Sequence, residues 1–395
     1  MMKKCILLAL IALITAPLLL HAAKQSTDEL LAALKSEKAS TREKAARELG
    51  ERGEKLGLQA LVAATADKDK NVQMAAVVAI GKINDPGQVS ALCKAVRNAN
   101  GEAQKEGLHL LTEHYIPNYD RDSLKEMWKS MADVFNPPHP AIAEPWIPVD
   151  DEAIDAILFV LDDKNSENRI EAAATLGILR TDKAIPRLTY YLNSPNPKMA
   201  RTCVRALGYI GKSDSGSALV PMMKHSDREV VIDSIRVLGQ FRYAPALPDL
   251  TQFLEFNRDE RYKEVALQAI SRIGDPSSEQ TVKKYYSSSN KEMRQYSIEA
   301  FGRMKLRGYL DPLKRELQKE KDMRLKLAMC FSLFALGDPA YIESLVRALP
   351  DRIYKPQARE YIIELGKPAV PQVAGYLKSE KKELRLEVIR ILADM

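Results

Sequence analysis

The sequence contains few of the residues from which catalytic and metal sites are built. Only five of its 395 residues are histidine and two are tryptophan, and neither a phosphate-binding glycine loop nor a GxSxG motif occurs. His109 and His114 are five residues apart, whereas two metal ligands on one side of a helix need a spacing of three or four. We therefore expect no catalytic residues, no metal site and no cofactor.

Aromatic residues and excess charge are scarce as well. Aromatic residues make up 6% of the chain, which suits the packing of helix on helix. The formal net charge is +6, and +4 without Lys3 and Lys4, which is too small to indicate a nucleic-acid partner. Apolar residues at 46% and charged residues at 28% are typical of a folded protein.

Residues 1–23 have the pattern of a secretory signal peptide. Lys3 and Lys4 precede an apolar run over residues 5–14, and small residues follow before the chain becomes polar. We expect cleavage after this segment and export to the periplasm or cell envelope of a bacterium. The alternative is an uncleaved anchor, because about 19 weakly polar residues nearly reach the roughly 20 that span a bilayer. Membrane contact would then be confined to this segment.

The rest of the chain is built from one repeated pattern. Residues 184–214 show it well, with two short helical patterns, a polar break between them and a glycine at the end. We take as the anchor the residue that follows the last large apolar side chain of the second helix. The eleven anchors are Gly50, Gly81, Thr112, Gly177, Gly208, Gly239, Ser271, Gly302, Phe334, Ile363 and Ala393. A period of about 31 residues with two helices per unit predicts an all-α fold, an α-α superhelix.

Positions within the repeat predict how its helices pack, begin and end. Six anchors are glycine, although a glycine inside a helix costs roughly 1 kcal/mol relative to alanine, which predicts a close helix crossing there. Twelve residues before the anchor, nine of the eleven positions are Asp or Asn, the preferred N-cap residues. Three residues after the anchor, a residue able to adopt the left-handed conformation is predicted to end the helix. These predicted stops are Gly53, Asn84, Gly211, Gly274, Gly337 and Gly366.

The run RALGYIGKSD and the related AIGKINDP, AISRIGDP and LFALGDP resemble the HEAT-like repeat of phycobilisome lyases. A proline early in the first helix is also similar to HEAT repeats, and it occurs at Pro186, Pro248, Pro312 and Pro371. The resemblance covers about residues 26–395 apart from one insertion, and it implies an armadillo-like helical fold, a HEAT-like solenoid. It says little about function, because such repeats occur in proteins with unrelated tasks.

Two groups of enzymes contain repeats of this kind, and the sequence differs from what each group would require. The iron-binding hydroxylase branch of HEAT-like proteins uses repeated His-Glu dipeptides, and this sequence contains none. Bilin attachment, the lyase activity, is cytoplasmic in its family and disagrees with an export signal.

A basic side chain recurs eight residues before the anchor in seven repeats. One interpretation is a basic stripe on one surface, and the other is a bond from each side chain to the adjacent inter-helix turn. The Asp–Arg ladder of HEAT families implies the second interpretation, which we favour. The residues are Arg42, Arg169, Lys263, Arg294, Lys326, Lys355 and Arg385.

The three cysteines beyond the N-terminal segment are predicted to be buried free thiols. Cys93, Cys203 and Cys330 are more than a hundred residues apart, and therefore three or more repeats apart. Neighbouring helices are about 8–10 Å apart, so no two of these residues can reach the roughly 5.5 Å Cα separation of a disulfide.

One spacing between anchors is 65 residues, which equals one period and 34 further residues. It places an insertion at residues 115–149, between three repeats in residues 24–114 and eight repeats in residues 150–395. The insertion combines a predicted amphipathic helix with a segment rich in proline and tryptophan. It is either an arm that docks a partner or a degenerate repeat whose helix packs on its neighbours and whose loop is held in place by Trp146. The sequence leaves both interpretations open.

Two segments carry opposite charge and suggest where a partner binds. Residues 150–171 have a net charge of −6, and residues 283–326 have a net charge of +7. Separated patches of this kind steer partners, although solvated helix faces look similar in sequence. Our candidate partner-binding residues come from the insertion and the basic segment. They are Trp128, Trp146, Pro137, Pro138, Pro140, Lys283, Lys284 and Arg294.

Together these features favour an exported, non-catalytic scaffold that binds a protein or peptide along its curved surface. The alternative is a lyase-like enzyme or enzyme accessory that holds a small ligand in the concave groove. Nucleic-acid binding would show as salt-sensitive affinity for DNA, and the export signal disagrees with it.

Overall fold

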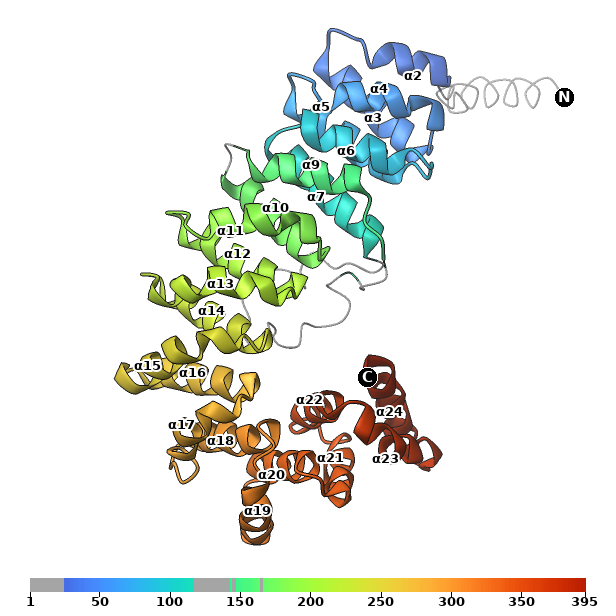
Figure 1. The fold of residues 1–395 in the computed structure, drawn as a ribbon. Helices are drawn as coiled ribbons and strands as arrows, with labels where there is room; N and C mark the ends of the chain where they lie inside the picture. Colours follow the sequence, from blue (N-terminus) through green and yellow to red (C-terminus); the bar gives the residue numbers. More distant parts are fainter. Residues whose placement is uncertain (1–24, 117–142, 144–146, 164–165) are drawn as a thin grey trace, which may run out of the picture. The chain divides into compact units, whose positions relative to one another are not determined.

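The computed structural model describes residues 25–116, 143, 147–163 and 166–395. The predicted signal peptide lies outside these residues, and so do the insertion candidates Trp128, Pro137, Pro138, Pro140 and Trp146. The described part of the chain divides into two compact units, one ending at Thr181 and the other spanning Asp182–Met395 (Figure 1).

The helices form eleven consecutive pairs within the described residues. In the first unit they are α2 (Thr27–Ala33) with α3 (Ala39–Glu51), α4 (Leu58–Ala64) with α5 (Lys70–Lys82), α6 (Gln88–Asn98) with α7 (Gly101–Tyr115), and α9 (Asp151–Leu161) with α10 (Ser166–Ile178). In the second unit they are α11 (Ile185–Tyr191) with α12 (Pro197–Ile210), α13 (Gly216–Leu219) with α14 (Arg228–Gln240), α15 (Leu247–Phe256) with α16 (Glu260–Ile273), α17 (Glu279–Lys283) with α18 (Lys291–Arg303), α19 (Leu310–Leu317) with α20 (Met323–Ala335), α21 (Ile342–Ala348) with α22 (Lys355–Leu365), and α23 (Val370–Gly375) with α24 (Lys382–Asp394).

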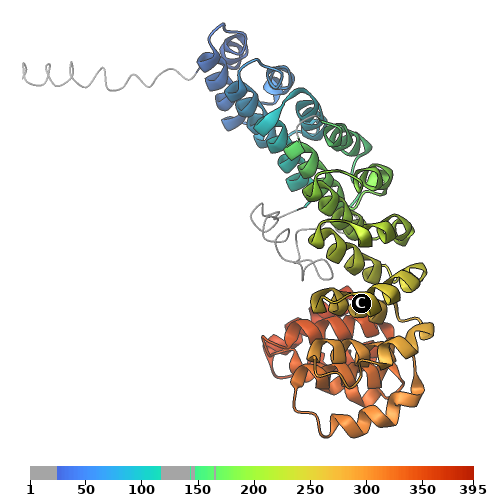
Figure 2. The same ribbon diagram turned by 90° about the vertical axis from the view of Figure 1, so that its left-hand side faces the viewer.

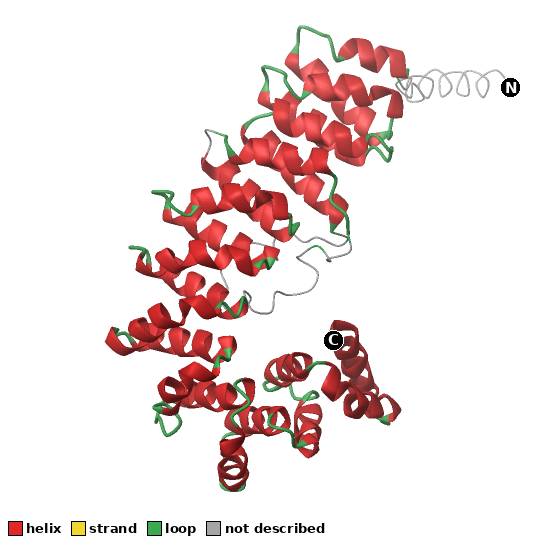
Figure 3. Cartoon of the chain, viewed as in Figure 1, coloured by secondary structure: helices red, strands yellow, loops and turns green. Residues whose placement is uncertain are grey.

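Within each unit the second helices of successive pairs lie side by side and form one layer. In the first unit this layer is α3, α5, α7 and α10, and in the second unit it is α12, α14, α16, α18, α20, α22 and α24 (Figures 1 and 2). The first helices pack on this layer, and no strand occurs among the described residues (Figure 3). The predicted all-α fold, an α-α superhelix, is confirmed. None of the described helices combines the length and the hydropathy that crossing a bilayer requires.

The glycine anchors allow neighbouring second helices to approach at backbone distance. A Cβ atom added to Gly50 would lie 2.5 Å from the Cα of Ala79, and one added to Gly302 would lie 2.7 Å from the Cα of Ser332. A backbone atom cannot rotate away as a side chain can, so the helices would have to separate. The predicted close crossing is therefore confirmed, and its partner is the residue two places before the next anchor.

Six of the predicted N-caps hold the starts of second helices, whereas Asn100 makes no capping hydrogen bond at α7, and the N-cap of α22 is Tyr354, three residues after the predicted Asp351. In α12, the side chain of Asn196 accepts a hydrogen bond from the backbone N–H of Lys198, and Pro197 occupies the first turn, where its missing N–H does no harm. Side chains in the same position cap five further second helices in this way. They are Asp69, Asp227, Asp259, Asn290 and Asp322.

The stop position behaves as predicted at its glycines and differs at Asn84. Gly53, Gly211, Gly274, Gly337 and Gly366 all have positive φ. Asn84 does not, because the side chain of Gln88 donates to the carbonyl oxygens of Ile80 (3.1 Å) and Gly81 (2.8 Å) and satisfies the end of α5. In three further repeats the residue three places after the anchor is not glycine but still adopts the left-handed conformation. These residues are Arg180, Arg242 and Lys305, with φ of 54°, 48° and 56°.

Among the basic side chains eight residues before the anchor, the arginines bind inter-helix turns, whereas Lys263 pairs with Glu260 of its own helix and Lys355 with Glu387 of α24. Arg42 donates to both carboxylate oxygens of Asp67 at 2.6 and 2.7 Å, and to the carbonyl oxygens of Ser36 and Glu37. Arg385 donates to the carbonyl oxygens of its own turn in the same way. These contacts confirm the structural interpretation for the arginines, because their side chains hold the turns and do not form a free basic stripe.

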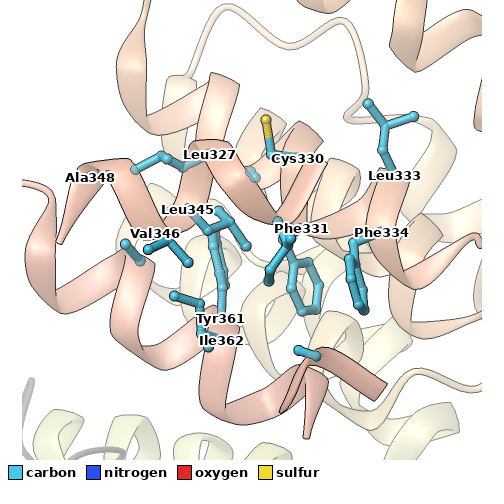
Figure 4. Close-up of a cluster of buried hydrophobic side chains, with 14 of the residues drawn as sticks. Leu327, Cys330, Phe331, Leu333, Phe334, Leu345, Val346, Ala348, Tyr361 and Ile362 are labelled. Carbon is cyan, nitrogen blue, oxygen red and sulfur yellow. The ribbon is translucent and has the colours of Figure 1, made fainter. Parts of the chain in front are cut away.

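Large apolar residues of α20, α21 and α22 form a shared core near the end of the second unit (Figure 4). Phe331 of α20 and Tyr361 of α22 stack with ring centroids 4.7 Å apart and an interplanar angle of 26°. The three cysteines Cys93, Cys203 and Cys330 are free and buried, as predicted.

The first prediction concerns the helix crossing at Gly302. Gly302→Ala should push α18 away from α20 and lower the free energy of unfolding by roughly 1–3 kcal/mol, as overpacked sites do. Gly308→Ala is the matched control, because no atom lies within 4 Å of its added Cβ. Urea unfolding followed by circular dichroism would measure both. A Gly302→Ala variant as stable as the wild type would contradict the close crossing.

Candidate functional site

One side of the second helices in the second unit carries polar and charged residues. These residues occupy positions seven and three residues before the anchor and one residue after it, so they recur every four residues on one side of the helix. In α16 they are Glu264, Gln268 and Arg272, and in α18 they are Gln295, Glu299 and Arg303. In α20 the same positions hold Leu327, Phe331 and Ala335, so the polar side is interrupted there. We call this side, from α12 to α22, the second-helix face.

Helix α22 contacts this face across several repeats. Glu364 accepts two hydrogen bonds from Arg303 and one from Arg242, all at 2.8 Å, and these arginines are 61 and 122 residues away in sequence. Glu360 pairs with Arg272, which is 88 residues away. We call Arg242, Arg272, Arg303, Glu299, Glu360, Tyr361 and Glu364 the α22 clasp. Repeats in a solenoid ordinarily contact only their neighbours, so this contact is an addition to the stacking.

Arg303 lies at the centre of the clasp. Its side chain is 4% exposed, and besides Glu364 it donates to Glu299 and to the hydroxyl of Ser271, both at 2.8 Å. Its guanidinium carbon also lies 5.2 Å from the centre of the Phe331 ring. Burial alone would lower the pKa of Arg303, but the charges and hydrogen bonds of Glu299 and Glu364 raise it above its ordinary value. The guanidinium therefore stays charged.

Two groups of the clasp, Glu364 and Tyr361, have shifted pKa values. Burial alone would raise the pKa of Glu364, but the charge and hydrogen bonds of Arg303, with Arg242 and Arg272, lower it below its ordinary value. Burial, followed by the charge of Glu299, raises the pKa of Tyr361 well above its ordinary value. Its hydroxyl donates to Glu299 and accepts a hydrogen bond from the Gln357 amide at 2.8 Å.

Towards α12 the same face is paired between neighbouring helices. Asp233 of α14 is fully buried and accepts hydrogen bonds from Arg201 at 2.9 Å and Arg205 at 2.6 Å, both from α12. Glu229 of α14 lies 3.0 Å from Arg201 and 3.3 Å from Arg261 of α16. Charges on this part of the face therefore join adjacent repeats.

The candidate residues of the basic segment lie on two helices of the eighth repeat. Lys283 is the last residue of α17 and is exposed, and Lys284 follows it and forms an ion pair with Glu255 at 2.6 Å. Arg294 lies in α18 and pairs with Glu316 and, at 3.0 Å, with Glu320. Other cations of the segment also find acids, as Lys314 does with Asp338 at 2.6 Å. Acids from adjacent repeats thus offset much of the segment's charge.

An open groove crosses the inter-helix turns of three consecutive repeats. It has a volume of about 780 Å³, and we call it the turn groove. Arg294 lines it together with residues of the next two turns, among them Lys321, Arg324 and Ile353. Ile353 is 67% exposed, which is unusual for an isoleucine. Of the eight sequence candidates, the structure places Arg294 in this groove.

Two further grooves adjoin on the first helices around α15. They have volumes of about 610 and 360 Å³ and share Gln252 and Phe256. Phe256 is 78% exposed. The charges beside these grooves, such as Asp249 and Lys224, have mixed sign, so their chemistry does not select one kind of ligand.

The described residues hold neither a cluster of metal ligands nor a thiol that is reactive at neutral pH. They contain no group of three or more His, Cys, Asp or Glu side chains placed to hold a metal ion. Burial raises the pKa of Cys93 to about 12 and raises the pKa of Cys203 and Cys330 above the ordinary value. These thiols are therefore protonated at neutral pH and are poor nucleophiles.

The clasp was not predicted from the sequence. Polar residues three before and one after the anchor were visible in repeats five to eight, at Arg205, Arg236, Glu299, Arg272 and Arg303. That pattern indicates a polar side of the second helix. It does not show that α22 lies against this side, because the pairing joins repeats that are two to four positions apart.

Comparison with known proteins supports the fold. A family model described as HEAT repeats matches residues 27–111 and 185–271, one stretch in each unit. No curated protein sequence gives a significant match. The lyase-type character of the repeats therefore stays a prediction, whereas similarity to HEAT repeats is established for the two matched stretches.

Solved structures show the same architecture. A crystal structure of importin beta has a TM-score of 0.52 at 12% identity, with 98% of this chain and 60% of importin beta covered. An engineered protein gives 0.43 at 18% identity and coverage of 93% and 98%, and Kap121p bound to the SUMO protease Ulp1p gives 0.46 at 13% identity and coverage of 93% and 44%. At 12% identity the similarity to importin beta shows the fold alone, a HEAT-like solenoid.

The second prediction tests the central arginine of the clasp. Arg303→Gln would leave the buried Glu299 without the cation it pairs with, and Glu364 with Arg242 alone, and should lower the free energy of unfolding by about 3–5 kcal/mol. Arg347→Gln is the control, because Arg347 is exposed and pairs only within its own helix with Glu343, so little change is expected. Equal urea unfolding midpoints for the two variants would show that the clasp does not stabilise the second unit.

The third prediction concerns acid. The folded-state pKa of Glu364 lies below its ordinary value of 4.5, so its contribution to stability is present above that pH and is lost as the pH falls through the lowered pKa. The thermal midpoint of the wild type should therefore exceed that of Glu364→Gln at pH 7, and the two should converge below about pH 4.5. If the difference between the two thermal midpoints stayed constant from pH 7 to pH 3, the carboxylate charge of Glu364 would not be the cause of the extra stability of the wild type.

Proposed function

We propose that this protein is an exported, non-catalytic scaffold that binds a protein or peptide partner across its repeats. The observation that carries the proposal is the turn groove, which is open and receives residues from three consecutive repeats. Solenoids use such continuous surfaces to bind partners, because each repeat adds one element of the same kind. Export rests on the pattern of residues 1–23, and the non-catalytic role rests on the scarcity of reactive residues.

The second-helix face between α14 and α22 is not the open surface. Arg303, Glu364 and Tyr361 fill it with their own hydrogen bonds; the side chains of Arg303 and Tyr361 are buried, and that of Glu364 is 15% exposed. We therefore place the partner's first contact at the inter-helix turns and not on the second-helix face. The alternative of a small ligand in a concave groove gains no support from this filled region.

The turn groove combines an apolar contact with exposed positive charge. Ile353 offers the apolar surface, and Lys321 and Arg324 are exposed beside it. Two of its acids are already paired, Asp322 with Lys291 at 2.7 Å and Glu320 with Arg294 at 3.0 Å. A peptide with an apolar anchor and flanking carboxylates fits this combination, since exposed apolar side chains and steering charges are what interfaces use.

The fourth prediction tests this groove in cells. Cross-linking followed by capture of the tagged full-length chain should enrich a reproducible set of partners with the wild type. Ile353→Glu places a charge on the apolar contact and should lower their recovery about tenfold, the effect of losing a strong interface residue.

Leu56→Glu is the matched control, because Leu56 is 77% exposed on the first unit and lies outside the groove. Its recovery should equal that of the wild type. Absence of any enriched partner, or equal recovery from Ile353→Glu and the wild type, would count against the proposal.

A further inference from the structure

The α22 clasp shows which kind of helix the second-helix face can bind. Its arginines come from three successive repeats, with Arg242 after α14, Arg272 in α16 and Arg303 in α18. The bound carboxylates, Glu360 and Glu364, are one helical turn apart and therefore lie on one side of α22. The second-helix face therefore binds a helix that carries two acidic residues at positions i and i+4.

Tyr361 adds a third point of recognition. It follows the first acid directly, its side chain is buried, and its hydroxyl donates to Glu299 of α18. The amide of Gln295 lies within hydrogen-bond distance of the same hydroxyl at 3.3 Å and donates to Glu299 at 2.7 Å. The complete recognised pattern is Glu-Tyr-x-x-Glu on a helix.

The bonds of Glu360 and Glu364 are separate from the apolar contacts that hold α22 in the stack, whereas Tyr361 takes part in both, because it also stacks on Phe331 of α20. Ala358 and Ile362 of α22 are fully buried, and α22 packs against α20, α21 and α24 as any second helix does. The clasp adds bonds to the sixth, seventh and eighth repeats. If α22 moved away, Arg303 would lose the carboxylate of Glu364, so another acidic helix would find paired donors already in place.

We propose that Arg242, Arg272 and Arg303 form a receptor for an acidic helix of a partner protein, and that α22 occupies this receptor in the resting chain. This inference rests on the proposed partner-binding function and names its regulation, because the partner helix binds by exchange with α22. Four repeat interfaces separate α14 from α22, and small rotations at each of them add up along a solenoid. Release of α22 therefore needs no unfolding of a repeat.

The probe that tests the receptor is the chain's own recognised segment. A fluorescent peptide of residues 353–368 is titrated with the full-length protein, and its anisotropy reports binding. The double variant Glu360→Gln/Glu364→Gln weakens the hold on α22 and should bind the peptide at least about tenfold more tightly than the wild type, because the competing helix no longer fills the site. Glu343→Gln/Glu383→Gln removes two exposed acids and should bind as the wild type does.

Two further measurements make the result decisive. A peptide in which both acids are glutamine should bind the opened variant far more weakly, and Arg272→Gln in that variant should reduce the difference between the peptides, because Arg303 and Arg242 still bind the second acid. Spin labels at Gln252→Cys and Lys382→Cys, both within the second unit, should show a longer or broader distance in the opened variant than in the wild type.

Equal binding of both peptides, no binding by the opened variant, or an unchanged spin-label distance would each overturn the proposal. Failure here is distinguishable from failure of the proposed function. The peptide titration depends on the arginines of the second-helix face, whereas capture of partners in cells depends on Ile353 in the turn groove.

Discussion

The structure depends on how closely successive second helices approach each other. At Gly302 the neighbouring backbone occupies the space that any Cβ would need, and Gly50 meets its neighbour in the same way. This contact sets the spacing of the layer, and the N-caps and turn-binding arginines then hold each pair in the same orientation. The polar side of the second helices is a consequence, because identical stacking brings the same register position of each repeat to one surface.

The clasp is a second level of organisation on this stack. Burying charge is costly, and a buried ion pair is weak evidence for net stability. The clasp is better understood as a geometric constraint that selects one arrangement of repeats six to ten among those the stacking permits. Arg303 is suited to this role because its planar group meets Glu364 through two bonds and Glu299 through a third.

Local and periodic features of this chain were predictable from sequence, and long-range ones were not. Asp227 and Asn290 could be identified as N-caps because their effect is confined to one helical turn. Asn84 was assigned wrongly because Gln88, four residues further on, satisfies the same carbonyl groups. Among the candidate site residues, Arg294 lines a groove, but nothing in its local sequence shows the groove, since the other walls come from later repeats.

Arg242 has one further consequence. It ends α14 in the left-handed conformation, with φ of 48°, where a residue other than glycine is disfavoured by roughly 1–2 kcal/mol. Five other repeats use glycine at this position and keep no side chain there. At Arg242 the backbone is in a disfavoured conformation, but the side chain supplies a guanidinium that donates a hydrogen bond to Glu364. The same residue thus ends α14 and binds α22, so the backbone conformation of Arg242 sets the position of a guanidinium that holds Glu364.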